Sequence, residues 1–116
     1  MVRTQWYHFK LGLAGRLGNW PLANYEVGQI RRSFENTAYV NTSISGVPLS
    51  QVLEQQSLPP LQEVQAAIAA KNAKGFAMAF GRLTAECNAC HAAADVGFIK
   101  VQVPTSSPFS NQVFPP

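Results

Sequence analysis

Two cysteines and a histidine stand close together near residue 90, in the run Cys87-Asn88-Ala89-Cys90-His91. Cysteines three residues apart on a helix lie on one face, close enough to add across the two vinyl groups of a single haem. The next residue then directs an imidazole at the iron from the same side. This spacing is the attachment pattern of haem c. The sequence therefore predicts one covalent haem c, with thioether links at Cys87 and Cys90 and His91 as the proximal iron ligand.

Other uses of these residues fit the chain less well. A structural zinc site needs four Cys or His ligands, usually as two separated pairs, whereas this chain has only two Cys and two His. Adjacent Cys90 and His91 would also have difficulty sharing one ion. A thioredoxin-type redox pair follows a strand in an α/β unit, and no strand–helix–strand pattern is recognisable. A simple disulfide and a chance match of the motif stay open as alternatives.

The second axial position decides what such a haem could do, and its candidates are His8, Met78 or no residue. On a helix through His8, Gly12 and Gly15 fall within about 40° of it. Each glycine costs a helix roughly 1 kcal/mol relative to alanine, so the pair predicts close approach of a flat group. We therefore expect His8 as the distal iron ligand and Gly12 and Gly15 as haem contacts. Alternatively, His8 is an ordinary core or surface histidine and the glycines only permit tight helix packing.

Met78 is the poorer candidate for the sixth ligand. It lies on the same predicted helix as His91 and thirteen residues before it, which is about 20 Å along a helix axis. We expect Met78 to fill space in the core.

Periodic apolar residues predict the helices that must position these groups. Four are expected, over approximately residues 3–17, 20–39, 60–72 and 73–94. Asn19 is the predicted N-cap of the second. Residues 41–60 contain several prolines and are predicted to form a long connection, with a short helical turn around 49–55. Short, long and short connections favour an all-α, four-helix up-down-up-down bundle, which we assign to a haem-bearing domain of residues 1–96.

Residues 97–116 form the second predicted unit, an extended tail. Four prolines exclude a helix there, and the segment is too apolar for a free disordered end. We expect it to lie along the bundle or partly cover the haem. A tail that is ordered only by a partner protein is the alternative.

Composition limits the classes of partner. Apolar residues make up 47% of the 116 residues, charged residues 13%, and the net charge is +3. The basic residues do not cluster as a nucleic-acid footprint would require, and no apolar run is long enough to span a bilayer. Because haem c is attached outside the cytoplasm, we expect a periplasmic bacterial protein whose leader peptide is absent from this chain.

The late position of Cys87-x-x-Cys90-His91, on the last of four helices, resembles the class II c-type cytochromes, the cytochrome c′ family and its low-spin relatives. The resemblance implies a left-handed four-helix bundle, His91 as proximal ligand, a distal residue from the first helix where His8 stands, and the option of a homodimer. Two features depart from the family. Its members present methionine or an apolar residue where His8 stands, and they usually end soon after the motif, whereas 25 residues follow His91 here. Residues 97–114 look like the ending of small bacterial cytochromes of this kind.

These features favour one-electron transfer between redox partner proteins, through a haem ligated by His8 and His91. A cytochrome c′-like protein that binds nitric oxide or carbon monoxide at an open or displaceable distal site is one alternative. A haem subunit of a larger redox complex is another. We do not expect an enzyme, because no second acid–base group is predicted near the haem once His8 is a ligand.

Overall fold

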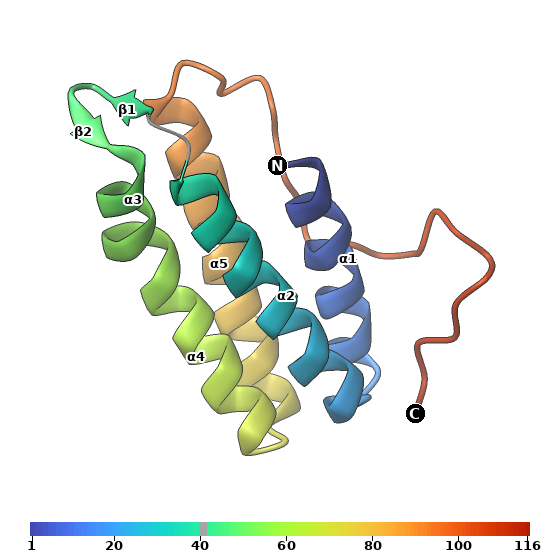
Figure 1. The fold of residues 1–116 in the computed structure, drawn as a ribbon. Helices are drawn as coiled ribbons and strands as arrows, with labels where there is room; N and C mark the ends of the chain where they lie inside the picture. The colour runs from blue at the N-terminus through green and yellow to red at the C-terminus, as the bar shows by residue number, and fades with distance from the viewer. Residues whose placement is uncertain (40–41) are drawn as a thin grey trace.

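The computed structural model describes residues 1–39 and 42–116. The chain is mostly helical (Figure 1), which confirms the all-α class. Its α-helices are α1 (Val2–Arg16), α2 (Trp20–Ala38), α3 (Leu49–Val52), α4 (Leu58–Ala69) and α5 (Ala73–Ala93). A π-helical turn, η1 (Leu53–Ser57), joins α3 to α4, and two short antiparallel strands, β1 (Ser43–Ile44) and β2 (Val47–Pro48), precede α3.

Two asparagines begin long helices by capping them. The side chain of Asn19 accepts a hydrogen bond from the backbone N–H of Leu22 at 3.3 Å, as predicted for α2. Asn72 accepts one from Gly75 at 2.9 Å at the start of α5. Each bond satisfies one of the N–H groups that a helix leaves unpaired in its first turn. The helix boundaries near both caps therefore follow from local sequence.

The long connection predicted between the second and third long helices contains more regular structure than expected. Residues 43–48 form a hairpin whose turn residues, Ser45 and Gly46, have φ angles of 53° and 81°. Positive φ at both central residues matches the twist of a two-residue hairpin, and glycine adopts it without strain. Residues 40 and 41, near the start of this predicted connection, lie outside the described residues.

The third helix, predicted to begin near Pro60, is α4, which begins at Leu58. The helical turn predicted around residues 49–55 is present, and it continues through η1 into α4. Pro59 and Pro60 lack an N–H, and their rings would clash with carbonyls one turn earlier in a regular α-helix. The wider π-helical turn at Leu53–Ser57 lies one turn before them, which lets the chain pass the prolines without stopping.

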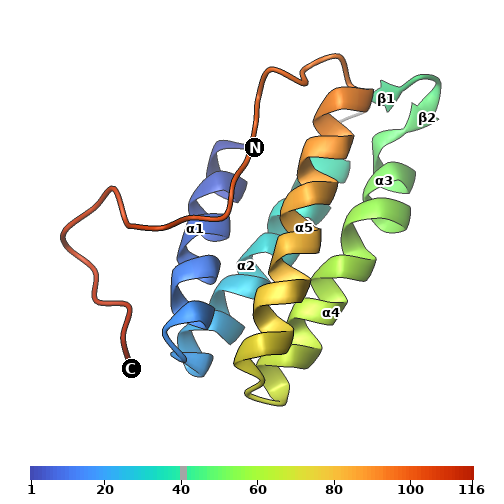
Figure 2. The same cartoon turned by 180° about the vertical axis from the view of Figure 1, so that it is seen from behind.

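The four long helices lie side by side and share one core (Figures 1 and 2). Helix α1 packs on α2 and α5, while α4 packs on α5 and α2. The largest fully buried side chains come from all four of them: Leu11, Ile30, Leu61, Val64, Phe80 and Leu83. The start of α1, the end of α5 and the β-hairpin lie at the same end of the molecule. Of the helices in the described ranges, none has the length and apolar character needed to cross a membrane.

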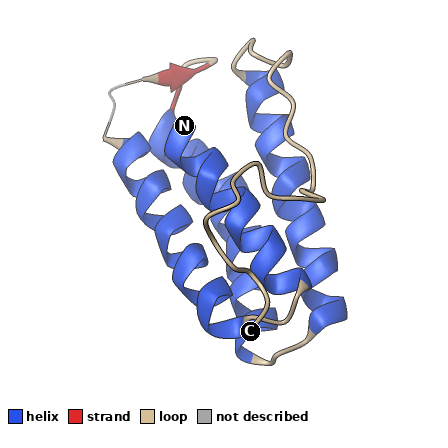
Figure 3. Cartoon of the chain, turned by 90° about the vertical axis from the view of Figure 1, so that its right-hand side faces the viewer, coloured by secondary structure: helices blue, strands red, loops and turns tan. Residues whose placement is uncertain are grey.

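The tail after α5 packs against the helices (Figure 3). It crosses from the end of α5 to α1, where Pro104 lies beside Gly12. Farther along, the ring of Phe109 packs edge-on against Trp6, with centroids 6.1 Å apart. Phe114 is only 6% exposed, and its carbonyl accepts a hydrogen bond from Asn19 at 2.9 Å. The tail is therefore fastened near both of its ends.

Candidate functional site

A large hollow of the described structure lies at the end of the molecule where α1 begins and α5 ends. Its volume is about 1070 Å³, and its walls come from α1, α2, α5, the β-hairpin region and the tail. His8, Cys87, Cys90 and His91 all line it. Packing thus brings together side chains that the sequence separates by about 80 residues. The volume is at the upper end of the range for ligand-binding pockets, about 300–1,000 Å³.

The two cysteines lie on the buried side of α5. Cys90 is 7% exposed and Cys87 is half-buried, and both thiols are free. The pKa of Cys87 is raised to about 11, mainly by burial and to a smaller extent by the neighbouring Cys90 thiol. Burial also raises the pKa of Cys90. Reactive cysteines of redox enzymes have lowered pKa values, so this pair is unlike a thioredoxin-type centre.

His91 is held by the tail in one tautomer. Its Nδ1 lies 2.7 Å from the backbone carbonyl oxygen of Ile99. A carbonyl oxygen can only accept a hydrogen bond, so Nδ1 carries the proton and Nε2 of the neutral ring keeps its lone pair. Metal-binding histidines usually donate their second nitrogen to a carbonyl or carboxylate in this way. The ring of His91 is therefore prepared to bind a metal through Nε2.

His8 is buried in the wall formed by α1 and is 6% exposed. Its Nε2 lies 2.9 Å from the hydroxyl of Thr84 on α5, and its ring stacks on Phe80 with centroids 4.6 Å apart. The Thr84 hydroxyl donates its single hydrogen to the carbonyl of Phe80, so it accepts one from Nε2 of His8. Desolvation by burial lowers the pKa of His8 to about 4. His8 is thus neutral at pH 7, and ligation through Nε2 would require it to leave Thr84.

The glycines of α1 face side chains of the protein. A Cβ at Gly15 would lie 2.1 Å from the ring of Phe76, and one at Gly12 would lie 2.7 Å from Pro104 and 2.8 Å from Phe80. The flat groups that approach α1 most closely are therefore phenyl rings of α5. This arrangement favours the packing alternative for both glycines, and a haem contact at either stays a prediction.

Met78 does not fill the core as predicted. Its side chain is 58% exposed on the outer face of α5. The apolar stripe of α5 runs through Phe76, Phe80 and Leu83, which are all buried. Met78 lies two residues after Phe76, and so on the opposite side of the helix.

Three residues near the cavity were not predicted from the sequence. Thr84 forms a hydrogen bond with His8, and the backbone carbonyl of Ile99 accepts one from His91. Asn88, inside the motif, binds the backbone of Val101. Thr84 could have been found, since it precedes Cys87 by three residues and so lies on the same helix face. The tail contacts carry no local sequence signal.

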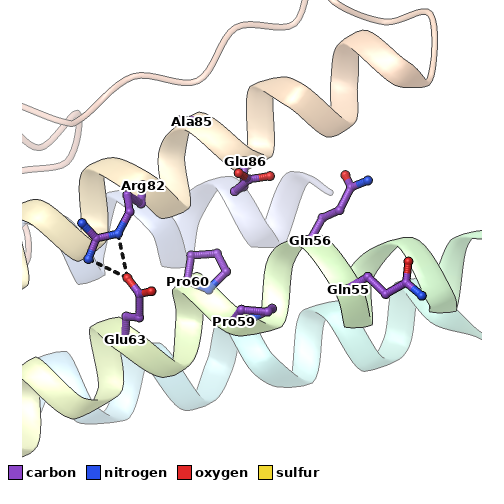
Figure 4. A pocket seen from close by; sticks show the side chains of 8 residues that line it. All are labelled: Gln55, Gln56, Pro59, Pro60, Glu63, Arg82, Ala85 and Glu86. Carbon is purple, nitrogen blue, oxygen red and sulfur yellow. Dashed lines mark hydrogen bonds and ion pairs between the residues drawn. The ribbon is translucent and has the colours of Figure 1, made fainter.

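A second hollow, of about 390 Å³, lies between η1, α4 and α5 (Figure 4). Arg82 and Glu63 form an ion pair of 2.6 Å across it, with both side chains about half-exposed. Exposed pairs of this kind contribute little to stability. None of the motif residues reaches this hollow, so it is not the candidate site.

A bare metal ion is a poor occupant of the main cavity. Within residues 1–39 and 42–116, no three His, Cys, Asp or Glu side chains are placed to hold one ion. The cavity instead offers two thiols on one helix face and two imidazoles from different helices. That donor set suits a large ring that is bonded at its edge and carries its own metal.

No protein family, curated protein or solved structure matches the chain. What can be inferred about function therefore comes from the cavity and from the motif that lines it.

Proposed function

We propose that the protein is a monohaem c-type cytochrome that transfers single electrons between partner proteins. Cys87 and Cys90 would hold the haem by thioethers, with His91 as proximal and His8 as distal ligand. Haem c supplies an iron centre that gains or loses one electron. The observation that carries the proposal is the convergence of these four side chains on one cavity of about 1070 Å³.

The protonation of the two histidines supports their proposed roles. A histidine binds a metal in its neutral form. The hydrogen bond from His91 to Ile99 leaves Nε2 of His91 free. Burial keeps His8 neutral, since its pKa is lowered to about 4. Two imidazole ligands favour a lower reduction potential than a histidine–methionine pair.

The proposal includes the wider setting of the site. We assign the helices to an up-down-up-down four-helix bundle of the class II type, with residues 97–116 as an added tail. The protein would be periplasmic, without enzymatic activity of its own. It would act on redox partner proteins, as a free carrier, as a homodimer or as a subunit of a larger redox complex.

One observation favours a second function, the binding of nitric oxide or carbon monoxide. Nε2 of His8 already donates to Thr84, and the ring is stacked on Phe80. If these contacts persist in the holoprotein, His8 does not bind the iron through Nε2. The distal side is then open to a small gas molecule, and the protein belongs with the gas-binding cytochromes c′.

Optical and electron paramagnetic resonance spectra of the purified holoprotein, with and without carbon monoxide, separate the two functions. Electron transfer predicts low-spin iron in both oxidation states that does not bind carbon monoxide. His8→Ala should convert it to high spin, while Met78→Ala, the matched control at an exposed site, should not. High-spin iron that binds carbon monoxide in the unmodified protein would contradict His8 ligation and support gas binding.

A further inference from the structure

The middle of the haem-attachment motif holds the tail through one side chain. The Nδ2 group of Asn88 donates to the carbonyl of Val101 at 2.8 Å, and the N–H of Val101 donates to Oδ1 of Asn88 at 2.8 Å. Both halves of the amide thus engage one residue. The two bonds also fix which way the amide faces, because a backbone N–H can only donate and a carbonyl can only accept.

This pair closes a short loop around His91. The loop begins where the N–H of Val96 donates to the carbonyl of His91 at 2.9 Å, and the N–H of Ile99 donates to the carbonyl of Val96 at 2.8 Å. It ends at the bonds between Asn88 and Val101. The carbonyl of Ile99 lies inside this loop, 2.7 Å from Nδ1 of His91.

The side chains of the loop do not hold it in place by themselves. Ile99 is 49% exposed and Phe98 is 79% exposed, so neither is anchored in the core. Without Asn88, the carbonyl of Ile99 would be free to turn towards water. His91 would then lose the acceptor that fixes its tautomer and orientation.

We infer that Asn88 is a positioning residue for the proximal ligand and thereby sets the reduction potential of the iron. This inference rests on the proposed haem function. By holding Val101, Asn88 keeps the carbonyl of Ile99 on Nδ1 of His91. A hydrogen bond at that nitrogen makes the imidazole a stronger donor to a metal. Stronger donation stabilises the oxidised iron and lowers the potential.

The test compares midpoint potentials of holoproteins by spectroelectrochemistry. Asn88→Ala should shift the redox equilibrium towards the reduced form by up to about tenfold, which is 59 mV for one electron. The proton on Nδ1 of His91 should also exchange faster with water, as followed by NMR. Asn24→Ala, which alters an exposed asparagine on α2, is the matched control and should change neither quantity.

A second variant approaches the same contact from the tail. Val101→Pro removes the N–H that donates to Asn88 and leaves the motif intact. If Asn88 acts through Val101, this variant shifts the potential in the same direction, and the double variant shifts it no farther than Asn88→Ala alone. It also keeps the inference testable should Asn88→Ala not fold.

The outcomes distinguish this inference from the proposed function. Unmodified protein with covalent haem, together with Asn88→Ala and Val101→Pro variants whose potentials match the Asn24→Ala control, would overturn the role of Asn88 and leave the cytochrome proposal standing. An unmodified protein that takes up no covalent haem would overturn both. A raised potential in either variant, with faster exchange at His91, supports the inference.

Discussion

Replacing Gly15 by alanine tests whether this glycine of α1 makes room for a packed phenyl ring or for a haem. The new Cβ would lie 2.1 Å from the Phe76 ring, so the ring would have to retreat by about 1.4 Å to reach an ordinary carbon contact of about 3.5 Å. Phe76 is 2% exposed, stacks on Phe80 and lies edge-on to Trp20. Because the ring is buried against these neighbours, the substitution overpacks the core.

The expected change in the free energy of unfolding of Gly15→Ala can be estimated from two opposing effects. Overpacking a core costs about 1–3 kcal/mol, and an overlap this close belongs at the upper end. Alanine returns about 1 kcal/mol through its better helix propensity. We therefore expect Gly15→Ala to lower the free energy of unfolding by about 2 kcal/mol. For a chain of this size, that corresponds to a fall of roughly 8 °C in Tm.

Gly81 supplies the matched control, because it also lies in a long helix but no atom of the described part of the chain comes within 4 Å of its Cβ position. Gly81→Ala should gain about 0.5–1 kcal/mol. Urea unfolding followed by circular dichroism measures both variants, and the visible spectrum of each holoprotein is recorded beside it. If Gly15→Ala is as stable as Gly81→Ala, the packing argument is wrong. An altered haem spectrum in Gly15→Ala without loss of stability would instead support the predicted haem contact.

Three further predictions concern two buried side chains, Glu26 and Cys87, and the hydrogen bonds of Asn19. Glu26 is 3% exposed, and its Oε2 has no hydrogen-bond partner among residues 1–39 and 42–116. Burial raises its pKa despite the opposing charge of Lys10. The pKa of Glu26 in the folded protein therefore lies above the ordinary value of 4.5. The free energy of unfolding falls as the pH rises from the ordinary pKa to the folded pKa, because the folded state holds the proton more tightly. Glu26→Gln should add about 1 kcal/mol at pH 7 and nothing at pH 3 in urea unfolding, and equal gains at both pH values would contradict this. Since the pKa of Cys87 is about 11, iodoacetamide at pH 8 should alkylate the folded haem-free chain at least about tenfold more slowly than the urea-unfolded chain; similar rates would show that the thiol is not buried. Asn19→Ala removes both the α2 cap and the bond to Phe114, so it should cost about 1 kcal/mol and speed proteolysis of the tail, whereas an unchanged tail cleavage rate would mean that the tail is held elsewhere.

Local patterns in the sequence were sufficient for the helices. Apolar spacing placed α1, α2 and α5 to within a few residues, and the cap at Asn19 could be named in advance. The helix start predicted near Pro60 lies close to Leu58, where α4 begins. The continuous path from α3 through the π-helical turn into α4 was not predicted, because that turn has no recognisable sequence signature.

The part of the candidate site that lies within one short segment was predictable from the sequence. Cys87, Cys90 and His91 belong to one motif, so their spacing alone indicated a common haem site. The position of His8 in the wall of the same cavity depends on how the helices pack. The place of Thr84 on the same face of α5 as Cys87 was predictable, but its bond to His8 was not. That bond and the one between Ile99 and His91 each join segments whose approach is set by tertiary packing.

Covalent haem attachment is tested by the mass and haem content of the chain after expression in the periplasm of bacteria that attach haem c. We expect the purified protein to carry one haem per chain, which resists extraction by acidified acetone and denaturation. The Cys87→Ala, Cys90→Ala double variant should carry none. A folded, unmodified protein with the bare polypeptide mass and no haem absorbance would overturn the cytochrome proposal.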